Sequence, residues 1–232
     1  MFFGLDLSST AMWSALGSIM LANIVLSGDN AVVIAMAARA LWPEHQNKAI
    51  FWGSAAAIVM RIILTLVAIQ LLALPYLKMV GAALLVYIGV DLLSGGDDDG
   101  GEDKQINGLG AAIRTILIAD LVMSLDNVLA VAAAAKGSTA LLVIGLLVSI
   151  PLIIFGSTLL MKVMERFPII ITLGAALLGF LAGEMLLTDP AVEGWFGKMG
   201  EQTVVFAGIL GAALVVSLGL WMQKRSAKSL AP

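Results

Sequence analysis

The chain has 232 residues, of which 60% are hydrophobic and 12% are charged, with a mean hydropathy of +1.03 and a formal net charge of −3. Soluble domains are about 45–50% apolar and about 25% charged, so this composition excludes a soluble globular protein and indicates a multi-pass membrane protein. There are no cysteines and one histidine, His45, which we expect in a loop. Thiolate chemistry is thus excluded, and we expect no enzyme, no prosthetic group and no nucleic-acid partner.

Apolar segments predict an all-α membrane protein. At about 20 residues per crossing, we expect seven transmembrane helices in a single domain, at residues 12–38, 48–73, 76–93, 109–135, 139–163, 168–187 and 203–222. Residues 94–108, between the third and fourth helices, are acidic and glycine-rich without the spacing of an EF-hand. We interpret them as a flexible cytoplasmic loop, with loose attraction of cations as the alternative.

The distribution of basic residues predicts the orientation, because Lys and Arg are enriched in cytoplasmic loops. One side carries nine of them: Arg39, Lys48, Lys104, Arg114, Lys162, Arg166, Lys224, Arg225 and Lys228. The other side carries three: Lys78, Lys136 and Lys198. The N-terminus is therefore expected outside and the C-terminus in the cytoplasm.

A polar motif occurs twice inside these apolar segments. Ser-x-Asp-Asn ends at Asn30 in the first predicted helix and at Asn127 in the fourth, and each copy has a polar residue, Asn23 or Asp120, seven positions before that Asn. Within a helix, this residue, the Ser and the Asn form one stripe. A carboxylate such as Asp29 costs about 2.5–3.5 kcal/mol at this depth, which suggests that the motif holds something positively charged.

The duplication extends beyond the motif. A Pro, a Gly-Ala-Ala-Leu-Leu string and an acid recur in register, so that Gly174 and Glu184 each lie 93 residues after Gly81 and Asp91. We therefore predict two three-helix repeats, about 12–93 and 109–187, with a seventh helix added. Repeats with an odd number of helices are inverted, and transporters of this kind bind substrate at the repeat interface near mid-depth.

The chemistry of the duplicated residues favours a hard divalent cation. Carboxylates, amides and hydroxyls are oxygen ligands, which suit Mg²⁺, Ca²⁺ and Mn²⁺. The candidate metal ligands are Asp29, Asn30, Asp126, Asn127, Asn23 and Asp120. Met123 is either a softer ligand that favours Mn²⁺ or apolar filler. The alternative is that these polar residues only hydrogen-bond helices together.

Other residues leave two interpretations open. Arg61, inside the second predicted helix, either neutralises one aspartate or takes part in a transport cycle. Asp91 and Glu184 lie near helix ends, where solvated roles compete with ion handling. The small-residue runs 53–57 and 208–213 allow close packing, either inside the protein or in a homodimer.

The sequences Leu-Ser-Gly-Asp-Asn-Ala in the first half and Met-Ser-Leu-Asp-Asn-Val-Leu-Ala in the second resemble the TerC family of bacterial membrane proteins, with the YjbE-type branch the most similar. The resemblance implies a relationship to LysE-type exporters, a location in the bacterial plasma membrane, and export of a divalent cation. Manganese is the expected ion, with Ca²⁺ and Mg²⁺ as alternatives and proton antiport as the expected coupling. Thylakoid relatives imply the alternative of a non-transporting assembly or scaffold factor.

Overall fold

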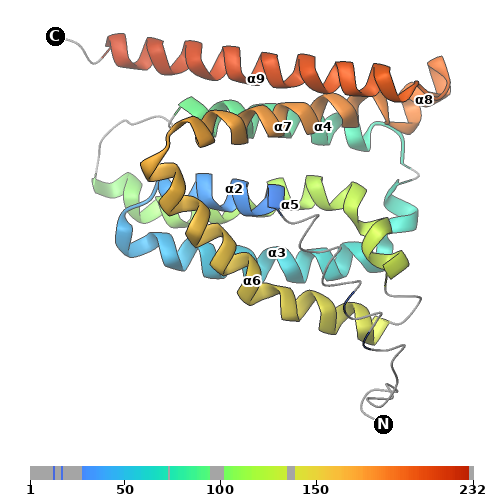
Figure 1. Cartoon of the computed structure of the whole chain (residues 1–232), viewed down its shortest axis with the longest axis horizontal. Helices are drawn as coiled ribbons and strands as arrows, with labels where there is room; N and C mark the ends of the chain where they lie inside the picture. Colours follow the sequence, from blue (N-terminus) through green and yellow to red (C-terminus); the bar gives the residue numbers. More distant parts are fainter. Residues whose placement is uncertain are drawn as a thin grey trace.

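A computed structural model of the chain describes residues 13, 17, 28–72, 74–94, 102–134 and 139–229 (Figure 1). For residues 66, 68–72, 102–107, 126–134, 139–142, 149 and 226–229, it describes the backbone alone. The described part consists of helices joined by short turns and contains no strand. Its helices are α2 (Gly28–Arg39), α3 (Pro43–Leu72), α4 (Leu77–Ser94), α5 (Glu102–Ala134), α6 (Thr139–Arg166), α7 (Ile169–Leu187), α8 (Pro190–Phe196) and α9 (Glu201–Ser229).

Six of the described helices are long and apolar enough to cross a membrane, which confirms the multi-pass prediction. The six segments are Pro43–Thr65, Leu77–Ser94, Gly108–Leu125, Val143–Arg166, Ile169–Leu187 and Glu201–Arg225. The first predicted span, 12–38, falls mostly outside the described residues, and α2 is its C-terminal part. Seven spans therefore remain a prediction.

Two helices begin clearly earlier than predicted, and one helix was not predicted. Helix α3 begins at Pro43, so His45 lies in its first turn rather than in a loop. Proline is favoured at the first position of a helix, because its missing N–H would have no partner there. Helix α5 begins at Glu102, inside the segment expected to be a loop. Helix α8 was not predicted, since seven residues are too few to give a clear apolar period.

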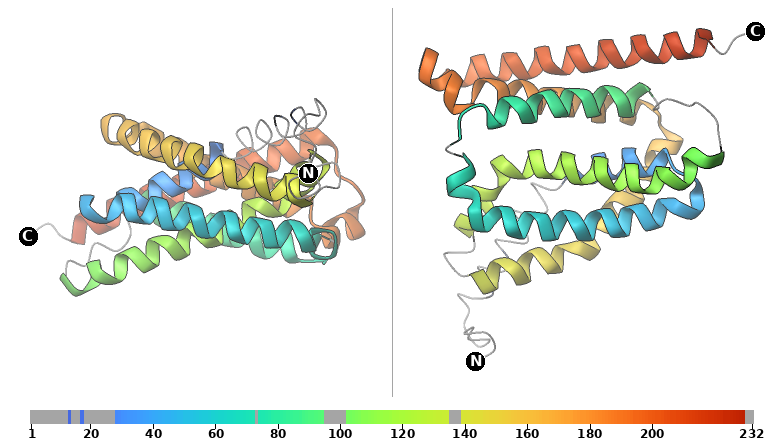
Figure 2. Two further views of the ribbon diagram at one scale, coloured as in Figure 1. Left: turned by 90° about the horizontal axis from the view of Figure 1, so that it is seen from below. Right: turned by 180° about the vertical axis from the view of Figure 1, so that it is seen from behind.

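The helices form a stack of roughly aligned layers (Figures 1 and 2). Helix α9 covers one face, α4 and α7 lie beneath it, α2 and α5 occupy the middle, and α3 and α6 complete the opposite side. Helix α6 contains Pro151 and changes direction along its length (Figure 1). The two helices that carry the polar motifs are thus enclosed between the other layers.

Glycines allow α7 and α9 to pack backbone against backbone. A Cβ on Gly179 would collide with the carbonyl oxygen of Gly211, and one on Gly183 with that of Ala207. In the other small-residue run, a Cβ on Gly53 would meet the side chain of Ile116 in α5. Both runs therefore make close contacts inside the protein, and the homodimer stays a prediction.

Asp189 ties together the end of the bundle at which α4 begins and α7 ends. Its fully buried carboxylate accepts hydrogen bonds from the backbone N–H groups of Tyr76 (2.9 Å), Met79 (3.2 Å) and Ala191 (2.8 Å). Tyr76 has a φ of 68°, a left-handed conformation that is uncommon for residues other than glycine. The bond from its N–H to Asp189 helps to hold this turn in place.

Burial alone would raise the pKa of Asp189, but hydrogen bonds from the backbone N–H groups of Ala191, Tyr76, Met79 and Lys78 outweigh it and hold the pKa below its usual value. A lowered pKa means that the ionised form stabilises the fold. This contribution is complete above the unfolded-state value of about 3.9 and is lost as the pH falls through the folded-state value.

We expect Asp189→Asn to lower the free energy of unfolding by about 1–3 kcal/mol at neutral pH, because an amide replaces one acceptor oxygen by a donor. The difference from wild type should persist down to about pH 4 and shrink below it. Thermal unfolding of the purified protein in detergent, measured at several pH values, tests this. Glu193→Gln in α8 is the control, and a difference that does not change with pH would contradict the expectation.

Candidate functional site

The first copy of the motif enters the described structure at the start of α2. Asp29 lies in the first turn of this helix and is partly buried, while Asn30 is 2% exposed. The backbone N–H of Asn30 donates to Oδ1 of Asp29 at 3.1 Å. Helix α2, whose first turn contains Asp29, begins about half way along the bundle (Figure 1).

Asp120, at the start of the second copy of the motif, belongs to a buried ion pair. Asp120 in α5 accepts a charged hydrogen bond from Arg61 in α3, through Oδ1 and Nη2, and both residues are at most 5% exposed. Nε of Arg61 donates to Oγ of Ser124 at 2.9 Å, and this hydroxyl donates to Oδ2 of Asp120 at 3.2 Å. The expected polar stripe on α5 is therefore confirmed for Asp120 and Ser124, and Arg61 is joined to it.

Asp29 belongs to the same cluster. It is close enough to Arg61 and Asp120 to interact with the charges of both. We call Asp29, Arg61, Asp120 and Ser124 the buried polar cluster. Its members come from α2, α3 and α5, so it joins an acid of the first half of the chain to an acid of the second.

Several predicted ligands lie outside the described residues or side chains. This is true of Asn23, and only the backbone of Asp126 and Asn127 is described, within α5. Among the described side chains, no group of three or more Asp, Glu or His residues is arranged to hold a metal ion. Met123 is buried in the main apolar core, as filler would be.

The remaining acidic candidates lie away from the middle of the membrane helices. Asp91 is in the last turn of α4 and Glu184 in the last turn of α7, both half-buried.

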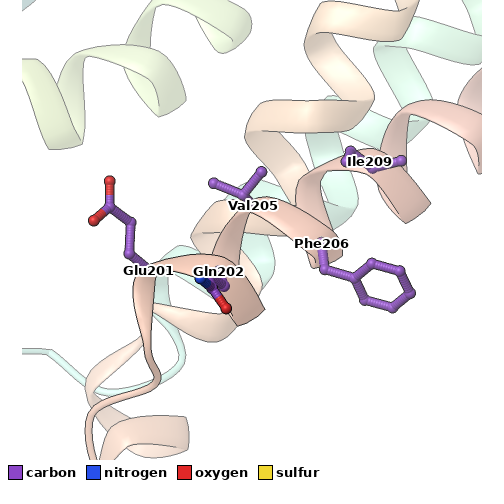
Figure 3. A pocket seen from close by; sticks show the side chains of 5 residues that line it. All are labelled: Glu201, Gln202, Val205, Phe206 and Ile209. Atoms are coloured by element: carbon purple, nitrogen blue, oxygen red, sulfur yellow. The ribbon is translucent and has the colours of Figure 1, made fainter.

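A surface hollow of about 350 Å³ lies along α9 (Figure 3), lined by Glu201, Gln202, Val205, Phe206 and Ile209. None of these residues comes from an element of the buried polar cluster.

A comparison of the two halves of the sequence gives a signal for the ion pair. Thr65-Leu66 and Thr158-Leu159 match at the same 93-residue offset, and each Thr hydroxyl donates to the carbonyl of the residue four positions earlier. At this offset the counterpart of Arg61 is Ile154, while the motif pairs Asp120 with the neutral Asn23. The pair Arg61 and Asp120 thus carries both charges, whereas the matched pair Ile154 and Asn23 carries neither.

We expect Asp120→Asn to destabilise the protein by about 3–5 kcal/mol, because it leaves the guanidinium of Arg61 buried without its counter-charge. Replacing both residues, as Arg61→Met with Asp120→Leu, should recover most of the loss, since no buried charge then remains. Thermal unfolding in detergent measures both variants. Unchanged stability of the single variant would show that the pair does not support the fold.

Comparison with known proteins agrees with this architecture. A family profile described as "Integral membrane protein TerC family" matches residues 8–227. The chain is 42% identical over 202 residues to the uncharacterized membrane protein YjbE of Bacillus subtilis (strain 168), covering 87% of this chain and 92% of that protein. It is 25% identical over 218 residues to the uncharacterized membrane protein YkoY of the same strain, covering 82% and 67%. No solved structure gives a significant match. The chain therefore belongs to the TerC family of integral membrane proteins.

Proposed function

We propose that this protein is a secondary transporter, related to LysE-type exporters, that exports a divalent metal cation across the bacterial plasma membrane. Manganese is the proposed ion, exchanged for protons, and the protein is neither an enzyme nor the carrier of a prosthetic group. The N-terminus is proposed to lie outside and the C-terminus in the cytoplasm, because basic residues favour cytoplasmic loops.

The observation that carries this proposal is the buried polar cluster. Ionised residues inside membrane helices are expensive, and they typically mark ion or substrate pathways. Here Asp29 and Asp120 come from different halves of the chain, and each lies within range of the other's charge. A cation bound between them would contact both halves at once, which alternating access requires.

Charge counting favours a divalent ion. Asp29, Asp120 and Asp126 supply three negative charges within the two motif helices, and Arg61 supplies one positive charge. The net charge of these four groups is two negative, which one divalent cation would neutralise. Carboxylate, amide and hydroxyl oxygens are the ligands that Mn²⁺ and Mg²⁺ accept.

We further propose that α2–α4 and α5–α7 are inverted repeats. The contacts between these halves support this, because each has a counterpart when the halves are exchanged: α3 with α5 matches α2 with α6, and α4 with α5 matches α2 with α7. The central pair also agrees in register. Gly81 and Leu85 of α4 are buried, as are Gly174 and Leu178 at the equivalent positions of α7.

Replacing the motif aspartates tests the transport proposal. We expect Asp29→Asn and Asp126→Asn to fold normally but to bind Mn²⁺ about ten- to a hundred-fold more weakly, because each loses a charged contact of about 1.5–3 kcal/mol. Mn²⁺ binding in detergent and flux in proteoliposomes are measured, with the exposed Glu165→Gln as the control. Absence of Mn²⁺ flux in wild type, with loss of association with partner proteins in both variants, would favour the scaffold alternative.

The membrane potential argues for coupling to a second ion. Moving one charge costs about 2.3 kcal/mol per 100 mV, so a divalent cation meets about 4.6 kcal/mol per 100 mV when it leaves a negative cytoplasm. We therefore expect Mn²⁺ efflux from proteoliposomes to drive proton uptake, and an imposed pH gradient to accelerate it. Mn²⁺ flux without proton movement at any imposed gradient would reject antiport.

A further inference from the structure

Arg61 is a permanent cation inside the site that we propose takes a divalent cation. The guanidinium does not lose its proton in proteins, and here it is 2% exposed, in contact with Asp120 and Ser124. A metal ion that uses Asp120 as a ligand would meet this charge at close range. The role of Arg61 therefore depends on whether it keeps its contact with Asp120 when a metal ion binds.

The geometry leaves little of Asp120 to share. Its Oδ1 accepts from Nη2 of Arg61, and its Oδ2 accepts from Oγ of Ser124 at 3.2 Å. Nε of Arg61 donates to the same hydroxyl at 2.9 Å, which closes a ring of three side chains. Because like charges repel strongly where water is excluded, a metal ion and the guanidinium compete for one carboxylate.

We propose that Arg61 and the transported cation bind Asp120 alternately, so that Arg61 is a built-in competitor that limits affinity and drives release. This inference rests on the proposed transport of a divalent cation. A transport site must bind its ion strongly enough to capture it and weakly enough to let it go. The return of Arg61 to Asp120 supplies the second condition.

The halves of the chain give an independent argument against a purely structural pair. The contact of α3 with α5, which contains the ion pair, has its counterpart in the contact of α2 with α6. At the positions matched by exchanging the halves, the sequence has the uncharged residues Asn23, which lies outside the described residues, and Ile154. The sequence therefore does not repeat the two charges, which supports a role for them beyond packing the helices together.

Arg61→Ala separates competition from structural support. Unlike the arginine, Asp120 can become neutral by taking a proton, so removing Arg61 is tolerated better than removing Asp120. At mildly alkaline pH, which keeps the released Asp120 ionised, we expect Arg61→Ala to bind Mn²⁺ at least about tenfold more tightly than wild type, the effect of one neighbouring charge on a carboxylate. Maximal flux should fall, because release slows. Arg61→Lys keeps the charge and should bind as wild type does, and Arg114→Ala on the exposed face of α5 is the matched control.

Adding free guanidinium ion to Arg61→Ala tests whether a cation in the place of the arginine competes with Mn²⁺. Millimolar guanidinium chloride should weaken Mn²⁺ binding to Arg61→Ala while raising its thermal stability, and it should leave wild type unaffected. A variant that folds poorly is purified with guanidinium and then titrated, so the sign of the effect is still measured.

The outcomes are distinct. The inference is overturned if Arg61→Ala binds Mn²⁺ no more tightly than wild type, or if guanidinium strengthens Mn²⁺ binding, because both results show that Arg61 supports the site. If wild type itself binds no Mn²⁺, the proposed function fails and the inference fails with it. Tight binding by wild type with an unaltered Arg61→Ala affinity refutes the inference alone.

Discussion

Charge inside a membrane needs a partner, and the fold is organised around this requirement. Arg61 and Asp120 are almost fully buried and are joined through Ser124. Each charge alone would cost several kcal/mol, but together with their hydrogen bonds they largely compensate each other. The pairing fixes how α3 and α5 are rotated against each other, and it brings the second polar motif to the side on which Asp29 lies.

The close helix packing and the buried polar cluster lie in different layers of the bundle. Helices α7 and α9 pack through glycines whose replacement would push the backbones apart, and Asp189 ties α4 to the turn before α8. These contacts are dry, close and rich in backbone atoms. The buried polar cluster lies in the other layers, in α2, α3 and α5.

A buried arginine paired with an acid of the second polar motif is the unusual feature of this protein. Structural ion pairs in proteins are often replaceable by apolar residues of similar size, and at the positions matched by exchanging the halves the sequence has the uncharged residues Asn23 and Ile154. Asp29 interacts with the charges of both Arg61 and Asp120, so a change at any of the three alters the electrostatic environment of the others.

The sequence by itself determined the membrane class, the spans at α3–α7 and α9, and the acids to examine, because hydropathy and motif spacing are local properties of the chain. It also predicted the stripe of Asp120 and Ser124, which follows from helical periodicity alone. It left open which aspartate Arg61 faces, and it did not single out Asp189, because both depend on which helices touch and how each is rotated. Only tertiary structure decides such contacts: Arg61 and Asp120 are 59 residues apart, and Tyr76 and Asp189 are 113 apart. The early start of α5 at Glu102 was missed for a related reason, since a polar helical turn outside the membrane leaves no apolar pattern.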